Sequence, residues 1–98
     1  MKGYWIARVD VSDPERYKDY VAANAAAFQK YGGKFLVRGG DFVSKRGTPR
    51  ARNVVIEFDT YEQAVACFNS PEYQSAFAIH QQCADSDVII IKGYDPAL

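Results

Sequence analysis

The chain has 98 residues, which is enough for one hydrophobic core, and we expect residues 1–98 to fold as a single domain. Twelve Lys and Arg residues balance twelve Asp and Glu residues, so the formal net charge is zero. Proteins that bind nucleic acid or anionic membranes through charge usually carry a basic excess, and we predict neither partner.

Residues 3–11 alternate between two kinds of side chain. Trp5 and Val9 belong to an apolar set, whereas Ile6 and Arg8 belong to a mixed set on the other face. Alternation with a period of two is typical of a β-strand with one buried face. The sequence therefore predicts a first strand here, with its apolar face toward the core.

A helix is predicted after this strand. Two capping patterns fit its start, namely Ser12 with Glu15, or Asp13 followed by Pro14. Apolar side chains then recur at three- and four-residue steps and give the helix one apolar stripe. Glycine accepts the left-handed conformation that closes a helix, so we expect the helix to end at residues 32–33.

Two strands and a hairpin turn are predicted next. The second strand covers residues 34–38, is interrupted by the glycine pair 39–40 and resumes over residues 41–45. A glycine pair inside a strand usually marks a bulge or a bend. Residues 46–51 are expected to form the turn, and residues 52–58 the third strand.

The last third of the chain predicts helical segments and a final strand. Thr60 and Gln63 have capping-box spacing, and Ser70-Pro71 begins a further helical segment. Residues 88–94 are expected to form the last strand. The order predicts the α+β fold class, as a ferredoxin-like βαββαβ sandwich with an antiparallel four-stranded sheet and helices on one face.

The sheet face away from the helices is predicted to be a contact surface. Ile6, Leu36 and Val55 would form an exposed apolar patch there, and such patches mark interfaces. Two-fold homodimers are the commonest assemblies of soluble proteins. We therefore predict a homodimer that covers this face.

Four charged side chains are predicted on the same face: Arg8, Asp10, Arg38 and Glu57. One interpretation is that they bind a polar or anionic small molecule, because arginine holds a carboxylate through paired hydrogen bonds. The other is an ion-pair network that closes the dimer, which the equal numbers of each sign favour.

Aromatic side chains, among them Trp5, Tyr17 and Tyr73, are predicted between the helices and the sheet. Aromatic residues at helical spacing usually fill a core. Ala7 beneath them is small, however, and an apolar cleft with phenol tips would suit a flat aromatic ligand. Both interpretations are compatible with the sequence.

His80 is the only histidine of the chain. It lies three residues after Phe77 and seven after Tyr73, so all three can share one helix stripe. An ordinary histidine pKa of ~6.5 would let it act as a general base near neutral pH. The alternative is a histidine on the flank of a helix with one hydrogen bond.

Four cations cluster where the hairpin tip is predicted: Lys45, Arg46, Arg50 and Arg52. A solvated turn is the ordinary explanation, and an acidic partner is the alternative.

Two cysteines are too few for a disulfide scaffold and lack metal-ligand spacing, so we expect reduced thiols and no metal. With no signal-peptide core and no apolar run of ~20 residues, we expect a cytoplasmic protein.

Several segments resemble a bacterial family of unknown function, the one numbered 1330. They are residues 4–11 followed by 13–14, residues 30–40 (KYGGKFLVRGG), residues 53–58 and residues 69–74 (NSPEYQ). That family resembles the dimeric α+β-barrel superfamily, in which two ferredoxin-like sheets pack face to face. The resemblance implies a dimeric α+β barrel. Its superfamily includes cofactor-free quinol monooxygenases, haem-degrading monooxygenases, muconolactone isomerases and chlorite dismutases.

Haem-degrading members need an asparagine on the first strand and a tryptophan on the second helical region. Here the first strand has no asparagine and the only tryptophan is Trp5, so we predict no cofactor. A fold does not define a reaction. We expect an uncharacterised protein that binds a small organic molecule. The alternative is a cofactor-free monooxygenase- or isomerase-like enzyme for a small aromatic or quinol substrate, with His80 as its base.

Overall fold

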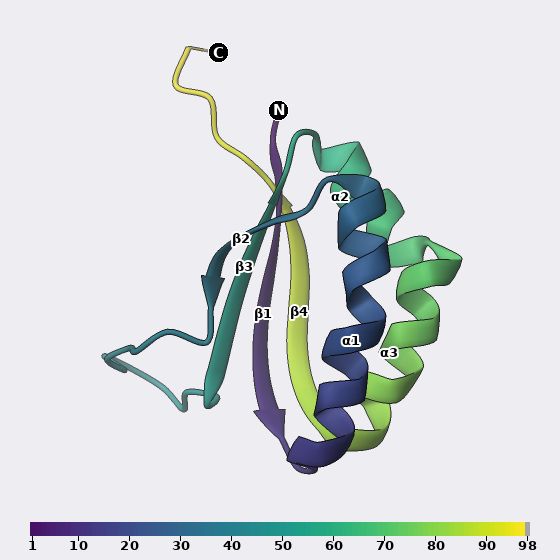
Figure 1. Cartoon of the computed structure of the whole chain (residues 1–98). Helices are drawn as coiled ribbons and strands as arrows, with labels where there is room; N and C mark the ends of the chain where they lie inside the picture. Colours follow the sequence, from purple (N-terminus) through teal and green to yellow (C-terminus); the bar gives the residue numbers. More distant parts are fainter. Residues whose placement is uncertain (98) are drawn as a thin grey trace.

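The computed structural model describes residues 1–97 and shows a four-stranded sheet with its helices on one face (Figure 1). The elements are β1 (Gly3–Val11), α1 (Pro14–Tyr31), β2 (Lys34–Arg38), β3 (Arg52–Phe58), α2 (Tyr61–Asn69), α3 (Pro71–Cys83) and β4 (Ala84–Lys92). The strand order is β2-β3-β1-β4, and every neighbouring pair is antiparallel. This arrangement confirms the predicted ferredoxin-like βαββαβ fold. No helix within residues 1–97 has the length and apolar character to cross a membrane.

Short polar side chains determine where the helices begin. Asp13 caps α1, because its carboxylate accepts a hydrogen bond from the backbone N–H of Arg16 at 3.2 Å. Of the two predicted caps, Asp13 is therefore the one used. Thr60 caps α2 in the same way. Gly32, at φ +73°, ends α1 in the left-handed conformation.

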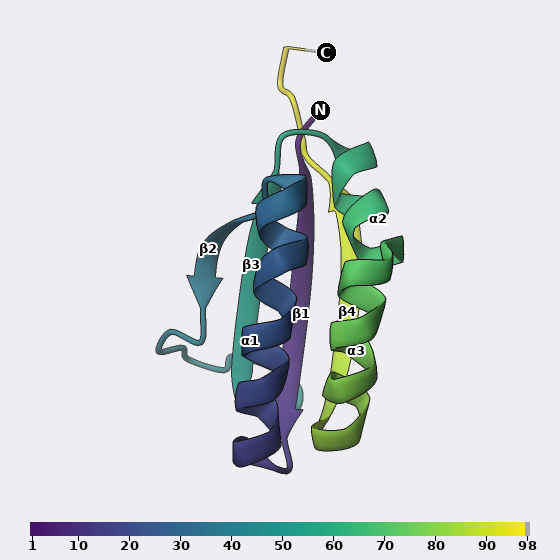
Figure 2. The same ribbon diagram turned by 45° about the vertical axis from the view of Figure 1, so that its right-hand side comes forward.

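The core lies between the sheet and the helix layer, in which α1 and α3 run side by side (Figure 2). Trp5 of β1 lies at its centre and is 2% exposed. Its indole N–H donates to the carbonyl oxygen of Ala64 at 2.8 Å. Its ring packs edge to face on Phe28 and Tyr73, with centroids 5.1 and 4.8 Å away. These contacts tie β1 to all three helices.

The prediction of a strand over residues 41–45 is wrong. The N–H of Gly39 donates to the carbonyl oxygen of Asn53 at 2.8 Å, and the φ of Gly39 is +70°. This left-handed conformation directs the chain away from β3. A loop then extends from the body of the molecule and returns only at Arg52 (Figure 1).

An irregularity in β2 exchanges the faces of the residues that follow it. The pairing with β3 shifts by one residue between Phe35 and Val37, so Leu36 is an extra residue in β2. A one-residue shift sends the following side chains to the opposite face. Arg38 consequently pairs with Val54, whose side chain is buried under the helices. The prediction that Arg38 lies on the face away from the helices is wrong.

The last strand is longer at its start than predicted. It begins at Ala84 instead of residue 88, and it ends at Lys92 instead of residue 94. The prediction depended on apolar side chains, and the segment 85–87 is polar. It is nevertheless part of the strand, because β1 pairs with all three of its residues. Its acidic side chains are exposed and form ion pairs with arginines.

Candidate functional site

A narrow recess, here called the α1 recess, lies between α1 and strands β1, β2 and β3. Its volume is about 30 Å³, which is room for about two water molecules. Two arginines, Arg38 and Arg52, belong to its lining. The other lining residues that matter below are Trp5, Ala7, Tyr17, Val21, Asn24 and Phe35.

Arg52 enters the α1 recess from β3. Its guanidinium carbon lies 5.8 Å from the centre of the Tyr17 ring, and its Nε is buried without a hydrogen-bond partner. A β-carbon at Gly39 would lie 2.6 Å from Nη1 of Arg52, so the glycine leaves the space that the guanidinium occupies. Within residues 1–97, no carboxylate forms a salt bridge with Arg52.

Arg38 lies at the rim of the same recess. Its side chain is exposed, and its guanidinium carbon lies 4.0 Å from the centre of the Phe35 ring, within the range of a cation–π contact. In the described part of the chain, Arg38 also has no carboxylate within 4.0 Å. The α1 recess therefore combines two uncompensated positive charges with an aromatic wall.

Two further polar side chains line the recess from α1. Asn24 is buried, at 5% exposed, and Tyr17 is half-buried. Burial raises the pKa of the Tyr17 hydroxyl, and the positive charge of Arg52 opposes that rise. Tyr17 is therefore a neutral hydroxyl at pH 7 and can donate or accept a hydrogen bond.

His80 lies close to the recess but does not line it. Its Nε2 is 3.0 Å from Oγ of Ser86, and its buried Nδ1 has no partner. The rings of Tyr20 and Phe77 pack on it, with centroids 4.7 and 5.6 Å away. Burial lowers the pKa of His80, so the imidazole is neutral at pH 7. A catalytic role for His80 stays a prediction.

Three of the predicted site residues lie on the face of the sheet away from the helices, here called the outer face. Arg8 pairs with Asp87 at 3.3 Å and Asp10 pairs with Arg50 at 3.0 Å, while Glu57 accepts a hydrogen bond from the Tyr4 hydroxyl at 3.2 Å. The fourth charge predicted on this face, Arg38, lies on the other face. Each of the three charges that do lie on the outer face thus has a partner within the chain. This arrangement favours a structural role for the outer-face charges.

Comparison with known proteins identifies the family. Residues 2–94 match the family described as Domain of unknown function (DUF1330). The chain belongs to this family. A search of curated proteins gave no match.

Solved structures similar to this DUF1330 chain support the same fold. A protein of unknown function from Rhodopseudomonas palustris shares 22% identity over 97% of this chain and 84% of its own, with a TM-score of 0.73. SnoaB, a cofactor-independent oxygenase from Streptomyces nogalater, shares 13% sequence identity over 96% of this chain and 94% of its own, with a TM-score of 0.67. A dimeric ferredoxin-like protein of unknown function from Thermobifida fusca shares 19% identity over 95% of this chain and 92% of its own, with a TM-score of 0.57.

The structure of the DUF1330 chain brings together three of the residues that its sequence singled out, Trp5, Tyr17 and Arg38. Tyr73 is buried behind them, with its hydroxyl 2.8 Å from that of Tyr20. Arg52 lies in the α1 recess and not at a solvated hairpin tip, so the prediction for this residue is wrong. Its inward position could have been predicted from the sequence, because Arg52 continues the inward alternation of the third strand.

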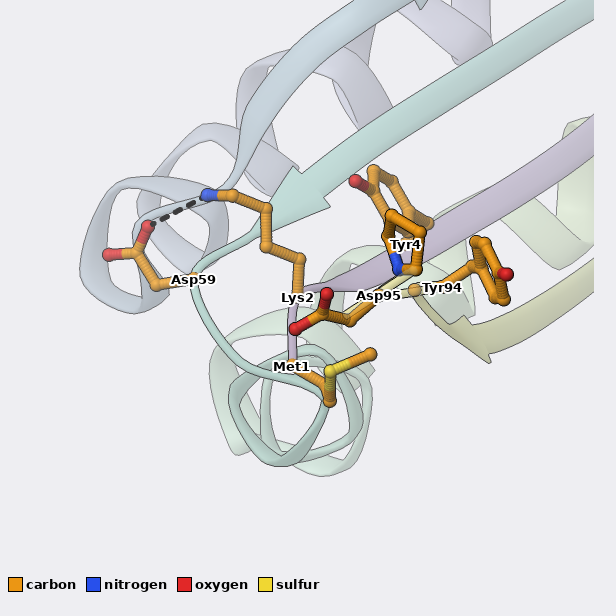
Figure 3. A pocket seen from close by; sticks show the side chains of 8 residues that line it. Met1, Lys2, Tyr4, Asp59, Tyr94 and Asp95 are labelled. Atoms are coloured by element: carbon orange, nitrogen blue, oxygen red, sulfur yellow. Dashed lines mark ion pairs between the residues drawn. The ribbon is translucent and has the colours of Figure 1, made fainter. Parts of the chain in front are cut away.

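A wider depression of about 360 Å³ lies where the N-terminus meets the segment after β4 (Figure 3). Its one basic side chain, Lys2, pairs with Asp59 at 3.8 Å and with Glu57 at 3.5 Å. This depression thus offers no uncompensated basic side chain, and we place the candidate site in the α1 recess instead. Within residues 1–97, no three His, Cys, Asp or Glu side chains are placed to hold a metal ion.

Proposed function

We propose that this chain is a homodimeric protein that binds a small organic molecule at the α1 recess. The observation that carries the proposal is the buried, unpartnered Nε of Arg52 within a mainly aromatic and aliphatic wall. Ligand sites commonly combine apolar walls with a few convergent polar groups. Arg38, Tyr17 and Asn24 supply further polar groups around the same space.

The size of the recess limits how a ligand can bind. Its 30 Å³ is far below the ~300–1,000 Å³ of a pocket that encloses a whole drug-sized molecule. We therefore expect one polar group of the ligand to enter, while its body lies on the rim beside Val21, Phe35 and Arg38. Because the Nε of Arg52 is buried, the entering group contacts it after a small shift of the side chains that line the recess.

Binding is better supported than catalysis. The enzyme alternative requires a substrate beside a base, whereas Tyr17, Tyr20 and Phe77 surround the ring of His80 and its Nε2 contacts Ser86. SnoaB is an oxygenase with the same fold, but a shared fold at 13% identity does not transfer its reaction.

The homodimer part of the proposal rests on the outer face. Ile89 and Ile91 of β4 are 53% and 46% exposed there, beside the half-buried Ile6 and Val55 of neighbouring strands. A contiguous apolar strip on an open sheet favours a second copy that covers it. Two such sheets face to face would form a dimeric α+β barrel.

A cytoplasmic location also belongs to this proposal, since both cysteines are free thiols.

The binding proposal is tested with ¹⁵N-labelled protein and four flat probes: benzoate, benzamide, benzyl alcohol and hydroquinone. We expect at least one probe to shift the amide resonances around Trp5 and Asn24. Ala7→Val, which places two extra methyl groups at the floor of the recess, should abolish these shifts. Ala26→Val on the exposed side of α1 is the matched control and should retain them. Recess resonances that no probe shifts would overturn the proposal.

A further inference from the structure

We infer that the ligand of the α1 recess is an organic carboxylate with a flat apolar body, anchored by Arg52 and assisted by Arg38. The inference rests on the proposed binding function and adds the chemical class of the ligand. Its starting point is the Nε–H of Arg52, which is buried and lacks an acceptor. A buried donor without an acceptor is unfavourable, so an acceptor from a ligand would be strongly bound there.

The arginines on the two faces of the sheet differ in how they are compensated. On the outer face, Arg50 contacts Asp10, Asp85 and Asp87, and their N–O distances are between 2.9 and 3.5 Å. On the helix face, Arg38 and Arg52 form no salt bridge within residues 1–97. On the outer face the chain thus supplies carboxylates to its arginines, whereas the two arginines that line the α1 recess receive none. Two arginines beside one recess without a carboxylate suit an anion from outside.

The shape of the site selects a carboxylate among anions. Room for about two water molecules matches the two oxygens of a carboxylate better than the four of a phosphate. A guanidinium presents its N–H groups as a planar fork that pairs with both oxygens of a carboxylate. Tyr17 and Asn24 can donate additional hydrogen bonds from α1.

The rim of the site selects a flat, apolar body for the rest of the molecule. The guanidinium of Arg38 lies on the Phe35 ring at 4.0 Å, which makes a planar surface beside the opening. Val21 of α1 adds an aliphatic side chain to the lining. An aromatic or unsaturated acid can place its carboxylate at Arg52 and its plane along this surface, so benzoate is a suitable probe.

Gly39 positions the anchor. Its backbone lies so close to Arg52 that a β-carbon would be 2.6 Å from Nη1, and its φ of +70° is one that glycine adopts without strain. The guanidinium thus lies beside the Gly39 backbone, with its carbon 5.8 Å from the centre of the Tyr17 ring.

The experiment compares benzoate with benzamide, which has the same shape without the charge, and with inorganic phosphate, by NMR titration of the wild-type chain. We expect benzoate to bind at least about tenfold more tightly than either. Arg52→Gln should weaken benzoate binding by about tenfold or more. Arg52→Lys keeps the charge but loses the planar pair of N–H donors, so its affinity for benzoate should lie between those of the wild type and Arg52→Gln. Arg46→Gln, in the exposed loop, is the matched control and should leave binding unchanged.

The outcomes separate the two proposals. If benzamide binds as tightly as benzoate and Arg52→Gln binds both normally, the carboxylate inference fails while small-molecule binding stands. Tighter binding of phosphate than of benzoate would also overturn the carboxylate. If no probe shifts the recess resonances, both proposals fail. Arg38→Gln is a second variant in case Arg52→Gln does not fold, and it should weaken benzoate binding by about threefold, as expected for an exposed cation.

Discussion

The hydroxyl groups of Tyr20 and Tyr73 lie 2.8 Å apart and join α1 to α3 inside the helix layer. Both side chains are buried, at 7% and 2% exposed, and burial raises the pKa of both phenols. Neither hydroxyl is ionised at neutral pH, so one donates and the other accepts. The pair is a neutral hydrogen bond between two helices that have no covalent connection nearby.

Tyr73→Phe should therefore lower the free energy of unfolding by about 1–2 kcal/mol, because it leaves the Tyr20 hydroxyl buried without its partner. Adding Tyr20→Phe should cost less than the sum of the two single changes, since the second change removes the unpaired group. Urea unfolding of the four proteins measures this coupling. Tyr94→Phe at an 88% exposed position is the control. Strictly additive effects would show that the hydroxyls are not coupled.

Stability should depend on pH through His80. Burial lowers its pKa in the folded chain, while the unfolded chain keeps a value of about 6.5. The unfolded state then binds more protons, so stability is full above pH 7 and falls as the pH drops through 6.5 toward the folded value. Urea unfolding at pH 7.5 and 5.5 should show this loss. His80→Gln should reduce it, and an equal loss in both proteins would contradict the assignment.

The same histidine permits a test of the catalytic hypothesis. We expect NMR to show a His80 titration midpoint below 6.5 that none of the four aromatic probes displaces, because the ring does not line the α1 recess. A probe that moves the midpoint would favour the enzyme alternative. In that case, His80→Gln should lower turnover by ~10²-fold or more.

The outer face should be sensitive to charge. Val55→Asp would place a carboxylate in the centre of the proposed interface without a dedicated partner, and should shift the chain from dimer to monomer. Sedimentation of the wild-type chain at micromolar concentration should give about twice the 11.0 kDa of one chain. Ala25→Asp on the exposed side of α1 should leave the dimer intact. A wild-type monomer at that concentration would refute the interface.

Gly3 provides a test of how β1 packs under α2. A β-carbon at Gly3 would lie 2.6 Å from Cα of Tyr61 and 2.9 Å from Cβ of Ala64, so Gly3→Ala must push the helix away. We expect a loss of about 1–3 kcal/mol in the free energy of unfolding. At Gly40 a β-carbon would meet nothing within 4 Å, so Gly40→Ala is the matched control. Equal stability of both variants would show that this contact is not tight.

The fold was largely predictable from the sequence, because alternation and capping decide local structure within a few residues. The bounds of β1 follow from the alternation around Trp5, and the start of α2 follows from the single cap Thr60. The polar start of β4 did not follow, since its pairing with β1 is a contact between distant parts of the chain.

The site was less predictable than the fold. Arg38 could not be assigned to the helix face, because the extra residue at Leu36 is defined only by pairing with β3. Arg52 could have been assigned there from its alternation with Val54 and Ile56. Its charge argued against that choice, since arginine is seldom buried. The unpaired state of its Nε depends on every neighbouring element, and the sequence carries no pattern for it.

The extra residue at Leu36 has a consequence for how this family can diverge. If β2 kept Leu36 but paired regularly with β3, Arg38 would lie opposite Asn53 on the outer face, which would remove one cation from the α1 recess and add it to the proposed subunit interface. At the end of β2, the pairing with β3 thus determines which surface a cation serves. Family members that keep the length between the glycine pairs 32–33 and 39–40 but lack this irregularity should therefore differ in both ligand preference and assembly, even where every side chain is retained.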